Sequence, residues 1–373
     1  MGKRLLRYFL RLLIFLGITL LLVAGILYGV LYKCCQGPSA AAKTTFVTTF
    51  LETGQLKFVP KLVCSTEEIN AIVDSNKMGK VEEQIDYSAI KIGEVEDPEV
   101  DPYEDPLGGG TEIHKEEIFD ENGIRIEEVH GRTFLGKMLI IKDPSQVIVG
   151  TTYSGGWGEY GKNLDEIVKR YNGVAGVNGG LYQSDANKGG KPYGIVVSNG
   201  EIQYNHPSQK GLYLIGFSED HKLIIADIDS MRNDASALKK FVQDNKIRDA
   251  VAFQEESSDA NNHFVPLVVN GKGRELKGQG SGSNPRTAIG QRKDGAILLF
   301  VADGRGAGGH LGATASDLIS VMLEYGAWNA ANVDGGSSSS MYYNGEYEMT
   351  SVTFYYQHAS WRLPDAFIVL PKN

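Results

Sequence analysis

Three glycine-rich loops between residues 284 and 341 constrain the fold of this chain most. They read N-P-R-T-A-I-G (284–290), V-A-D-G-R-G (301–306) and N-V-D-G-G-S-S-S-S-M (332–341), and each sets an Arg or Asp beside glycines at the end of an apolar run. An earlier segment, G-V-N-G-G-L-Y (176–182), has the same form. Strands that end in such loops build polar pockets for oxygen-rich, anionic ligands. The pattern predicts a strand-rich domain whose loops converge on one site.

Apolar runs beyond residue 111 predict many strands and few helices. Asn-Gly pairs at 122–123, 199–200, 270–271 and 344–345 indicate tight hairpin-type turns. Helical spacing follows Asn163 and the Thr314-x-x-Asp317 pair, and a further helix is expected over 236–245. The expected strands are 124–129, 137–141, 147–151, 195–198, 211–217, 223–227, 264–269, 286–291, 296–302, 331–334, 340–343 and 365–369. This order favours an α+β fold with a mixed β-sheet core and a few packed helices.

Two of these units resemble each other. A helix ending at Tyr171 leads into a short strand and Asn178-Gly179-Gly180, and a helix ending at Tyr325 leads into a strand and Asp334-Gly335-Gly336. The glycines lack side chains, so a ligand can approach the backbone there. A shared turn geometry would also explain the similarity. We expect both loops to face one pocket.

The N-terminus predicts a membrane anchor. Residues 1–11 carry Lys3, Arg4, Arg7 and Arg11, and residues 12–32 are uncharged over a length sufficient to cross a bilayer. Basic residues remain on the cytoplasmic side, so the domain would be extracytoplasmic. A cleaved signal peptide is the alternative, although its apolar region is usually shorter. The absence of Asn-x-Ser/Thr acceptors agrees with a bacterial protein.

The remaining chain divides by composition. Residues 33–92 form a membrane-proximal segment, in which Ser65 to Glu68 form a capping box at the start of a short helix. Residues 93–110 are acidic and rich in Pro and Gly, which predicts a linker before a domain at 111–373. Three cysteines are too few for a disulfide framework, and Cys64 is expected to be a small buried residue. A net charge of -9 argues against nucleic-acid binding.

Arg286 and Arg305 are the candidate anion ligands, and Asp303 and Asp334 the candidate acid–base groups. A guanidinium meets phosphate oxygens through two parallel hydrogen bonds and stays charged. Cleavage of a glycosidic bond usually needs two carboxyls, but a phosphate leaves as a stabilised anion, so arginines can take over part of the general acid's work. Structural ion pairs and ordinary Asp-Gly turns are the competing interpretations. Glu255 and Glu256 are weaker carboxyl candidates.

Other chemistries have less support. Ser337 to Ser340 offer hydroxyls, yet His263, His310 and His358 stand in no triad pattern, and no nucleophile elbow or phosphate-binding P-loop occurs. No cofactor is expected, although Asp303, Asp334 and Asn332 could together hold a divalent cation.

Taken in order and spacing, the motifs resemble the phosphodiester glycosidase family. R-T-A-I-G, D-G-R, a helix and N-V-D-G-G-S-S-S-S, preceded by V-N-G-G-L-Y, carry the resemblance from about Lys137 to the C-terminus. Ser337 stands where the family commonly has a third glycine. By position, the matching residues are Asn178, Gly179, Gly180, Arg286, Thr287, Asp303, Arg305, Asn332, Asp334, Gly335, Gly336, Ser338 and Arg362.

The resemblance implies an enzyme that hydrolyses a sugar-1-phosphodiester, here in a cell-wall or exopolysaccharide glycopolymer outside the membrane. Asp334 and Asp303 would be catalytic, and the other matching residues would bind substrate. Two alternatives remain open: a non-catalytic module that binds phosphate-containing glycan, and a glycosyl or phosphoglycosyl transferase.

Overall fold

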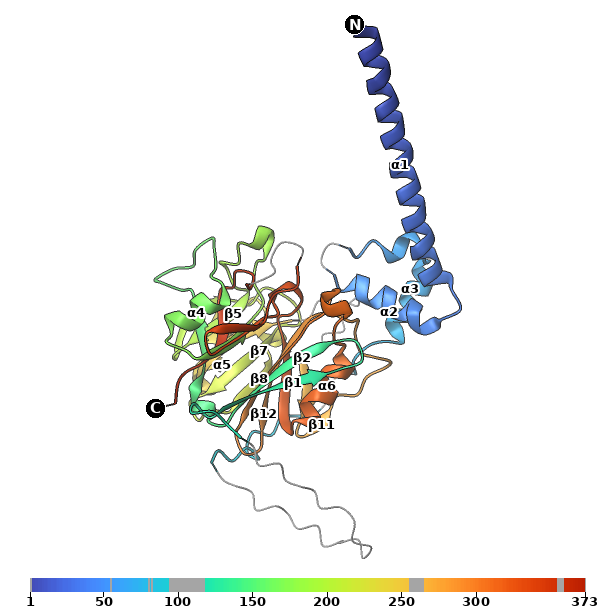
Figure 1. Ribbon diagram of the computed structural model, residues 1–373. Helices are drawn as coiled ribbons and strands as arrows, with labels where there is room; N and C mark the ends of the chain where they lie inside the picture. Colours follow the sequence, from blue (N-terminus) through green and yellow to red (C-terminus); the bar gives the residue numbers. More distant parts are fainter. Residues whose placement is uncertain are drawn as a thin grey trace, which may run out of the picture.

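The computed structural model describes residues 2–53, 56–79, 81, 83–93, 118–254, 265–353 and 359–372. In these residues six α-helices accompany three β-sheets, so the α+β class is confirmed (Figure 1). The helices are α1 (Gly2–Gln36), α2 (Ala40–Leu51), α3 (Thr66–Asp74), α4 (Leu164–Arg170), α5 (Ala235–Asp244) and α6 (Ala315–Glu324).

A seven-stranded sheet with the order β1-β2-β13-β12-β14-β10-β11 carries most of the motif-bearing strands. Its strands are β1 (Ile124–His130), β2 (Leu135–Ile141), β10 (Pro266–Val269), β11 (Lys272–Gly273), β12 (Arg286–Arg292), β13 (Ile297–Ala302) and β14 (Ala327–Val333). β12 lies between β13 and β14, with Thr287 opposite both Val301 and Val333. The loops after β13 and β14 therefore emerge on either side of the start of β12.

Two five-stranded sheets complete the fold. One has the order β16-β15-β4-β17-β3, and its strands are β3 (Val147–Thr151), β4 (Ala175–Asn178), β15 (Met341–Tyr343), β16 (Glu346–Met349) and β17 (Asp365–Val369). The other has the order β6-β5-β9-β7-β8, and its strands are β5 (Gly194–Ser198), β6 (Glu201–His206), β7 (Tyr213–Ser218), β8 (Leu223–Asp227) and β9 (Ile247–Phe253). The strand pairings in the described residues are antiparallel, which refines the expected mixed sheets.

Three of the four predicted Asn-Gly turns close hairpins. They join β5 to β6, β10 to β11 and β15 to β16. In each pair both residues have positive φ, as in Asn199 (51°) and Gly200 (76°), which is the conformation that makes Asn-Gly favourable in tight hairpins. The fourth pair, at 122–123, precedes β1.

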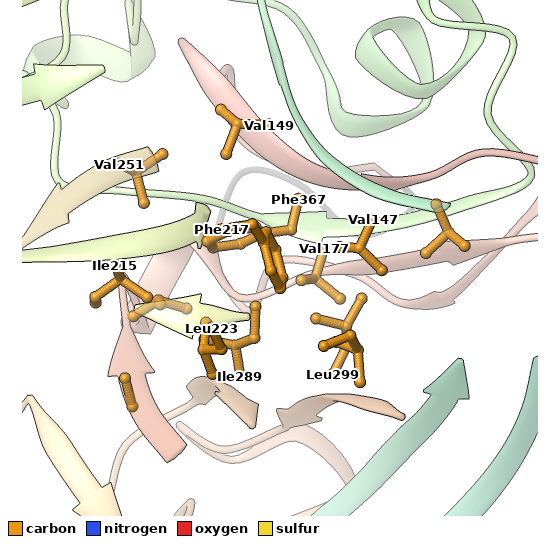
Figure 2. Packing of buried hydrophobic residues seen from close by; sticks show 14 of the residues in the cluster. Val147, Val149, Val177, Ile215, Phe217, Leu223, Val251, Ile289, Leu299 and Phe367 are labelled. Atoms are coloured by element: carbon orange, nitrogen blue, oxygen red, sulfur yellow. The ribbon is translucent and has the colours of Figure 1, made fainter. Parts of the chain in front are cut away.

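One core is shared by all three sheets. Figure 2 shows Val177 and Phe367 from the β4–β17 sheet meeting Phe217 from β7 and Leu299 from β13. The rings of Phe217 and Phe367 meet edge to face, with centroids 6.4 Å apart. Because each sheet buries a face against the others, the ends of β4, β12 and β14 are fixed relative to one another.

The N-terminal helix α1 projects away from the body of the molecule, with α2 and α3 at its base (Figure 1). Residues Arg4–Gln36 are long and apolar enough to cross a membrane by length and composition, and a signal sequence passes the same test. The prediction for Cys64 was incomplete. Cys64 is buried, but it forms a disulfide with Cys35, the next-to-last residue of α1.

The membrane-proximal segment packs on the domain. Gly79 donates its N–H to Glu275 O at 2.7 Å, Trp328 Nε1 donates to Asp86 O at 3.0 Å, and Met78 is buried in the core beside α6. The capping box at Ser65 starts α3 as expected. Of the expected linker, residues 94–110 lie outside the described residues, as do 111–117, so the domain boundary at Thr111 stays a prediction.

Candidate functional site

The two Gly-Gly loops touch each other. Asn178, at the end of β4, donates from Nδ2 to the backbone oxygen of Asp334, and Asp334 N–H donates to Gly179 O at 3.3 Å. The Asn178 Oδ1 atom accepts from Thr287 Oγ1 at 2.8 Å and from Ser340 N–H at 3.1 Å. Asn178 is fully buried, so this one amide joins two sheets and fixes the loop that carries Asp334.

Arg286 is buried at the start of β12 and has only 2% of its surface exposed. Its Nη2 atom donates to Glu52 Oε2 at 2.6 Å and to Gly282 O at 3.1 Å. A Cβ atom at Gly335 would lie 3.0 Å from Pro285 O and 3.7 Å from Arg286 Cα, so the Asp334 loop passes close to the start of β12. Arg286 thus lies beside the Asp334 loop and is held by an acidic partner that the sequence did not indicate.

Arg305 reaches the same loop from the other side. It stands in the turn after β13 with a φ of 52°, and its Nη1 atom donates to Ser337 Oγ at 2.7 Å. Gly336 has a φ of 61°, a conformation that favours glycine, and a Cβ atom there would lie 2.6 Å from Arg305 Nη2. Arg305 is exposed to solvent, yet desolvation by the surrounding protein and the positive charge of Arg286 lower the pKa of Arg305, and Asp334 opposes this effect. The three charged groups therefore influence one another.

Asp303 follows β13 and is paired with a histidine. Its Oδ1 atom accepts from Leu135 N–H at 2.8 Å, and its Oδ2 atom lies 2.7 Å from His310 Nδ1. Asp303 is 8% exposed, whereas the His310 side chain is one-third exposed. The sequence placed His310 in no catalytic pattern. The structure shows a carboxylate that orients an accessible imidazole, an arrangement suited to proton transfer.

Behind the Asp334 loop lie two further titratable groups. Tyr182 shares a hydrogen bond of 2.9 Å with Ser338, and both are buried. Burial, with the negative charges of Asp334 and Asp365, raises the pKa of Tyr182, so its hydroxyl stays protonated. Asp365 Oδ1 accepts the N–H of Gly180 at 2.7 Å. Neither Tyr182 nor Asp365 was among the predicted site residues.

The remaining predicted residues are less closely connected. Asn332 is fully buried on β14, opposite Ala288. Arg362 makes its described contacts with Asn187 and lies over the ring of Tyr160 at 5.6 Å, on the loops next to α4. Glu255, Glu256, His263 and His358 lie outside the described residues. In the part of the chain that is described, no group of three His, Cys, Asp or Glu residues is placed to hold a metal ion.

Comparison with known families agrees with this geometry. A family model described as phosphodiester glycosidase matches residues 171–370, which is more than half of the chain. The chain belongs to the phosphodiester glycosidase family. Membership supports a glycosidase-type, hydrolytic function, and the contacts between Asn178, Thr287 and the Asp334 loop all lie within the matching region.

Individual relatives are remote. A segment of 64 residues is 44% identical to an uncharacterized SPbeta prophage-derived protein, YomE, of Bacillus subtilis (strain 168), covering 17% of this chain and 10% of that protein. The chain therefore spans a small part of that relative.

Two solved structures match the chain at low sequence identity. The catalytic domain of zebrafish N-acetylglucosamine-1-phosphodiester alpha-N-acetylglucosaminidase is 18% identical, with a TM-score of 0.49 over 67% of this chain and 82% of that chain. An exported protein of Burkholderia pseudomallei is 16% identical, with a TM-score of 0.44 over 64% of this chain and 74% of that chain.

Proposed function

We propose that this protein is a membrane-anchored, extracytoplasmic glycosidase that hydrolyses a sugar-1-phosphodiester in a cell-wall or exopolysaccharide glycopolymer. The observation that carries the proposal is the position of the Asp334 loop between Arg286 and Arg305. The hydrogen bond from Asn178 to the Asp334 backbone oxygen fixes this loop. A carboxylate on a loop that is flanked by two arginines suits a substrate in which the bond to be cleaved ends in a phosphate. The family match supports the same reaction class.

The chemistry divides between these groups. In hydrolysis a bond forms from water oxygen to the anomeric carbon, and the bond from that carbon to the phosphate oxygen breaks. Its electron pair stays on the phosphate oxygen, and Arg286 and Arg305 stabilise the phosphomonoester that leaves. Asp334 acts as the base that takes the proton of water, or as a nucleophile that water later displaces.

Asp303 contributes through His310. A carboxylate hydrogen-bonded to Nδ1 fixes the tautomer of the ring and supports positive charge on it. His310 can therefore take the proton of water where Asp334 acts as the nucleophile, or pass to solvent the proton that Asp334 takes as the base. In this mechanism the half-buried Asp334 acts at the anomeric carbon, and the more deeply buried Asp303 orients His310.

The test is turnover of sugar-1-phosphodiesters by the full-length chain in detergent, with and without chelator. We expect a free sugar and a phosphomonoester in equal amounts, independent of chelator. Retention of the anomeric configuration would assign Asp334 as nucleophile, and inversion would assign it as base. Transfer of the sugar to an acceptor alcohol in place of water would identify a transferase. Affinity without turnover, unchanged in Asp334→Asn, would identify a binding module.

For location, two observations support the anchor. α1 passes the length and composition test for a membrane span, and Cys35 and Cys64 form a disulfide at its base. Structural disulfides persist in oxidising compartments, so the bond agrees with a domain outside the cytoplasm. The basic residues before the apolar run give the same orientation.

A further inference from the structure

The membrane-proximal segment reaches the candidate site from outside the region that matches the family. Glu52 directly follows α2, and its Oε2 atom lies 2.6 Å from Arg286 Nη2. Its Oε1 atom accepts the N–H of Gly282 at 2.6 Å. The side chains of Glu52 and Arg286 are each 2% exposed, so solvent does not screen this ion pair. A residue near the membrane anchor thus contacts an arginine of the candidate site.

Charge explains why such a partner is needed. Arg286 is buried, and the charge of Arg305 nearby repels it. A buried guanidinium is costly unless a counter-charge and hydrogen bonds accompany it. Glu52 supplies a full negative charge. It therefore offsets the buried charge of Arg286 and holds the guanidinium in one orientation.

The same segment also fixes the loop that leads into Arg286. Thr49 Oγ1 accepts the N–H of Ser283 at 3.2 Å, and Asn76 Nδ2 donates to Ser281 O at 3.2 Å. A Cβ atom at Gly282 would lie 2.6 Å from the Thr48 backbone, so α2 lies directly against this loop. The segment thus contacts residues 281–283 through both backbone and side chains.

We propose that Glu52 is a positioning residue for Arg286, and that the membrane-proximal segment completes the phosphate-binding part of the site. The inference rests on the proposed function and extends it to a residue outside the family region. An opposing interpretation gives Glu52 the place of the substrate phosphate, so that it would block the site. The geometry favours positioning, because the carboxylate is also bonded to a buried backbone N–H and lies within a packed contact, not at an open mouth.

The two interpretations predict opposite changes in kcat/KM when Glu52→Gln is made in the full-length chain. A positioning role predicts that kcat/KM for a sugar-1-phosphodiester falls about tenfold or more, mainly through a higher KM, because the amide keeps the shape but loses the charge. Glu52→Asp, which keeps the charge, should recover part of the loss. Glu67→Gln, an exposed carboxyl in the same segment, is the matched control and should leave kcat and KM unchanged.

A higher kcat/KM in Glu52→Gln would show that Glu52 blocks the site and would overturn the proposal. Equal loss for the glutamine and aspartate variants, with KM unchanged and a lower Tm, would reduce Glu52 to a structural role and overturn it as well. A second readout does not depend on turnover. Inorganic phosphate should raise the Tm of the wild-type chain and should do so less in Glu52→Gln.

That phosphate readout separates the two hypotheses. If the wild type turns over no phosphodiester but phosphate still stabilises it in a Glu52-dependent way, the proposed function fails and the positioning role stands. If the wild type is active and phosphate raises the Tm of the wild type and of Glu52→Gln equally, the proposed function stands and the positioning role of Glu52 is wrong. No stabilisation of the wild type by phosphate would also contradict the inference.

Discussion

Asp365 should make the stability of this protein fall as the pH rises, and Asp365→Asn should remove that dependence. The carboxyl begins β17, is 1% exposed, and holds the Gly180 N–H through Oδ1. Its Oδ2 atom is buried and has no hydrogen-bond partner among the described residues. Burial raises the pKa of Asp365 from 3.8 to about 7, against the lowering effect of the Gly180 bond. The folded state thus holds this proton to a higher pH than the unfolded chain.

The sign and the size follow from linkage. Between the unfolded and folded pKa values the folded state binds more protons, so each unit of rising pH costs about 1.4 kcal/mol of unfolding free energy. Integrated from pH 5 to pH 8 with the folded pKa of about 7, the loss is about 2–3 kcal/mol. For a domain of this size that corresponds to a Tm difference of roughly 4–12 °C.

The assay is thermal unfolding of the full-length wild type and Asp365→Asn in detergent from pH 5 to pH 8, followed by tryptophan fluorescence. The asparagine can still accept the Gly180 N–H, so the variant should fold. Its Tm should rise relative to that of the wild type as the pH rises. Asp185→Asn, at an exposed position, is the control. A difference between wild type and Asp365→Asn that stays constant over this range would refute the reasoning.

Three further outcomes are expected. Asp334→Asn should lower turnover by at least about a hundredfold with little change in Tm, because the charge and the proton-transfer capacity are lost while the turn is kept; activity within a few-fold of wild type would remove Asp334 from the mechanism. Arg286→Lys keeps the charge but loses the planar fork, so turnover should fall by roughly ten- to a hundredfold, and unaltered kinetics would make Arg286 structural. Protease added to intact protoplasts should release the domain, whereas protection of the C-terminus would reverse the orientation.

The sequence predicted those elements whose signals are local. Periodic apolar runs located β3 and β8 with the bounds that the structure gives, and Asn-Gly pairs located three hairpins. β9 was missed because Arg248 and Asp249 interrupt its apolar run; in the fold these two residues pair with each other. α2 was not predicted as a separate helix, since its threonines have low helix propensity and packing overrides them.

The candidate site was predicted only in part for a related reason. Asn178, Thr287 and the Asp334 loop were found from glycine-rich motifs, and they meet because their two sheets pack on one core. Glu52 and Arg286 are 234 positions apart, and no motif surrounds Glu52. Such pairs arise from tertiary packing, which leaves no periodic signal in the sequence. Asp365 was not predicted either, because only its burial in the folded protein distinguishes it from an ordinary strand residue.

If α1 is the proposed anchor, the short connection after it determines how far the candidate site can reach from the membrane. With about 20 residues in the hydrocarbon core and a rise of about 1.5 Å per residue, the end of the proposed anchor stands only about one helical turn outside the bilayer. α2 begins at Ala40, and the Cys35–Cys64 bond ties the end of α1 to the residues before α3. Because this region also contacts Arg286 through Glu52, a membrane-anchored chain would hold the candidate site at a set height above the lipid. Under the proposed function, polymer would have to come to the membrane to be cleaved, so the accessible material would be newly exported or lipid-attached chains, not the outer layers of the envelope.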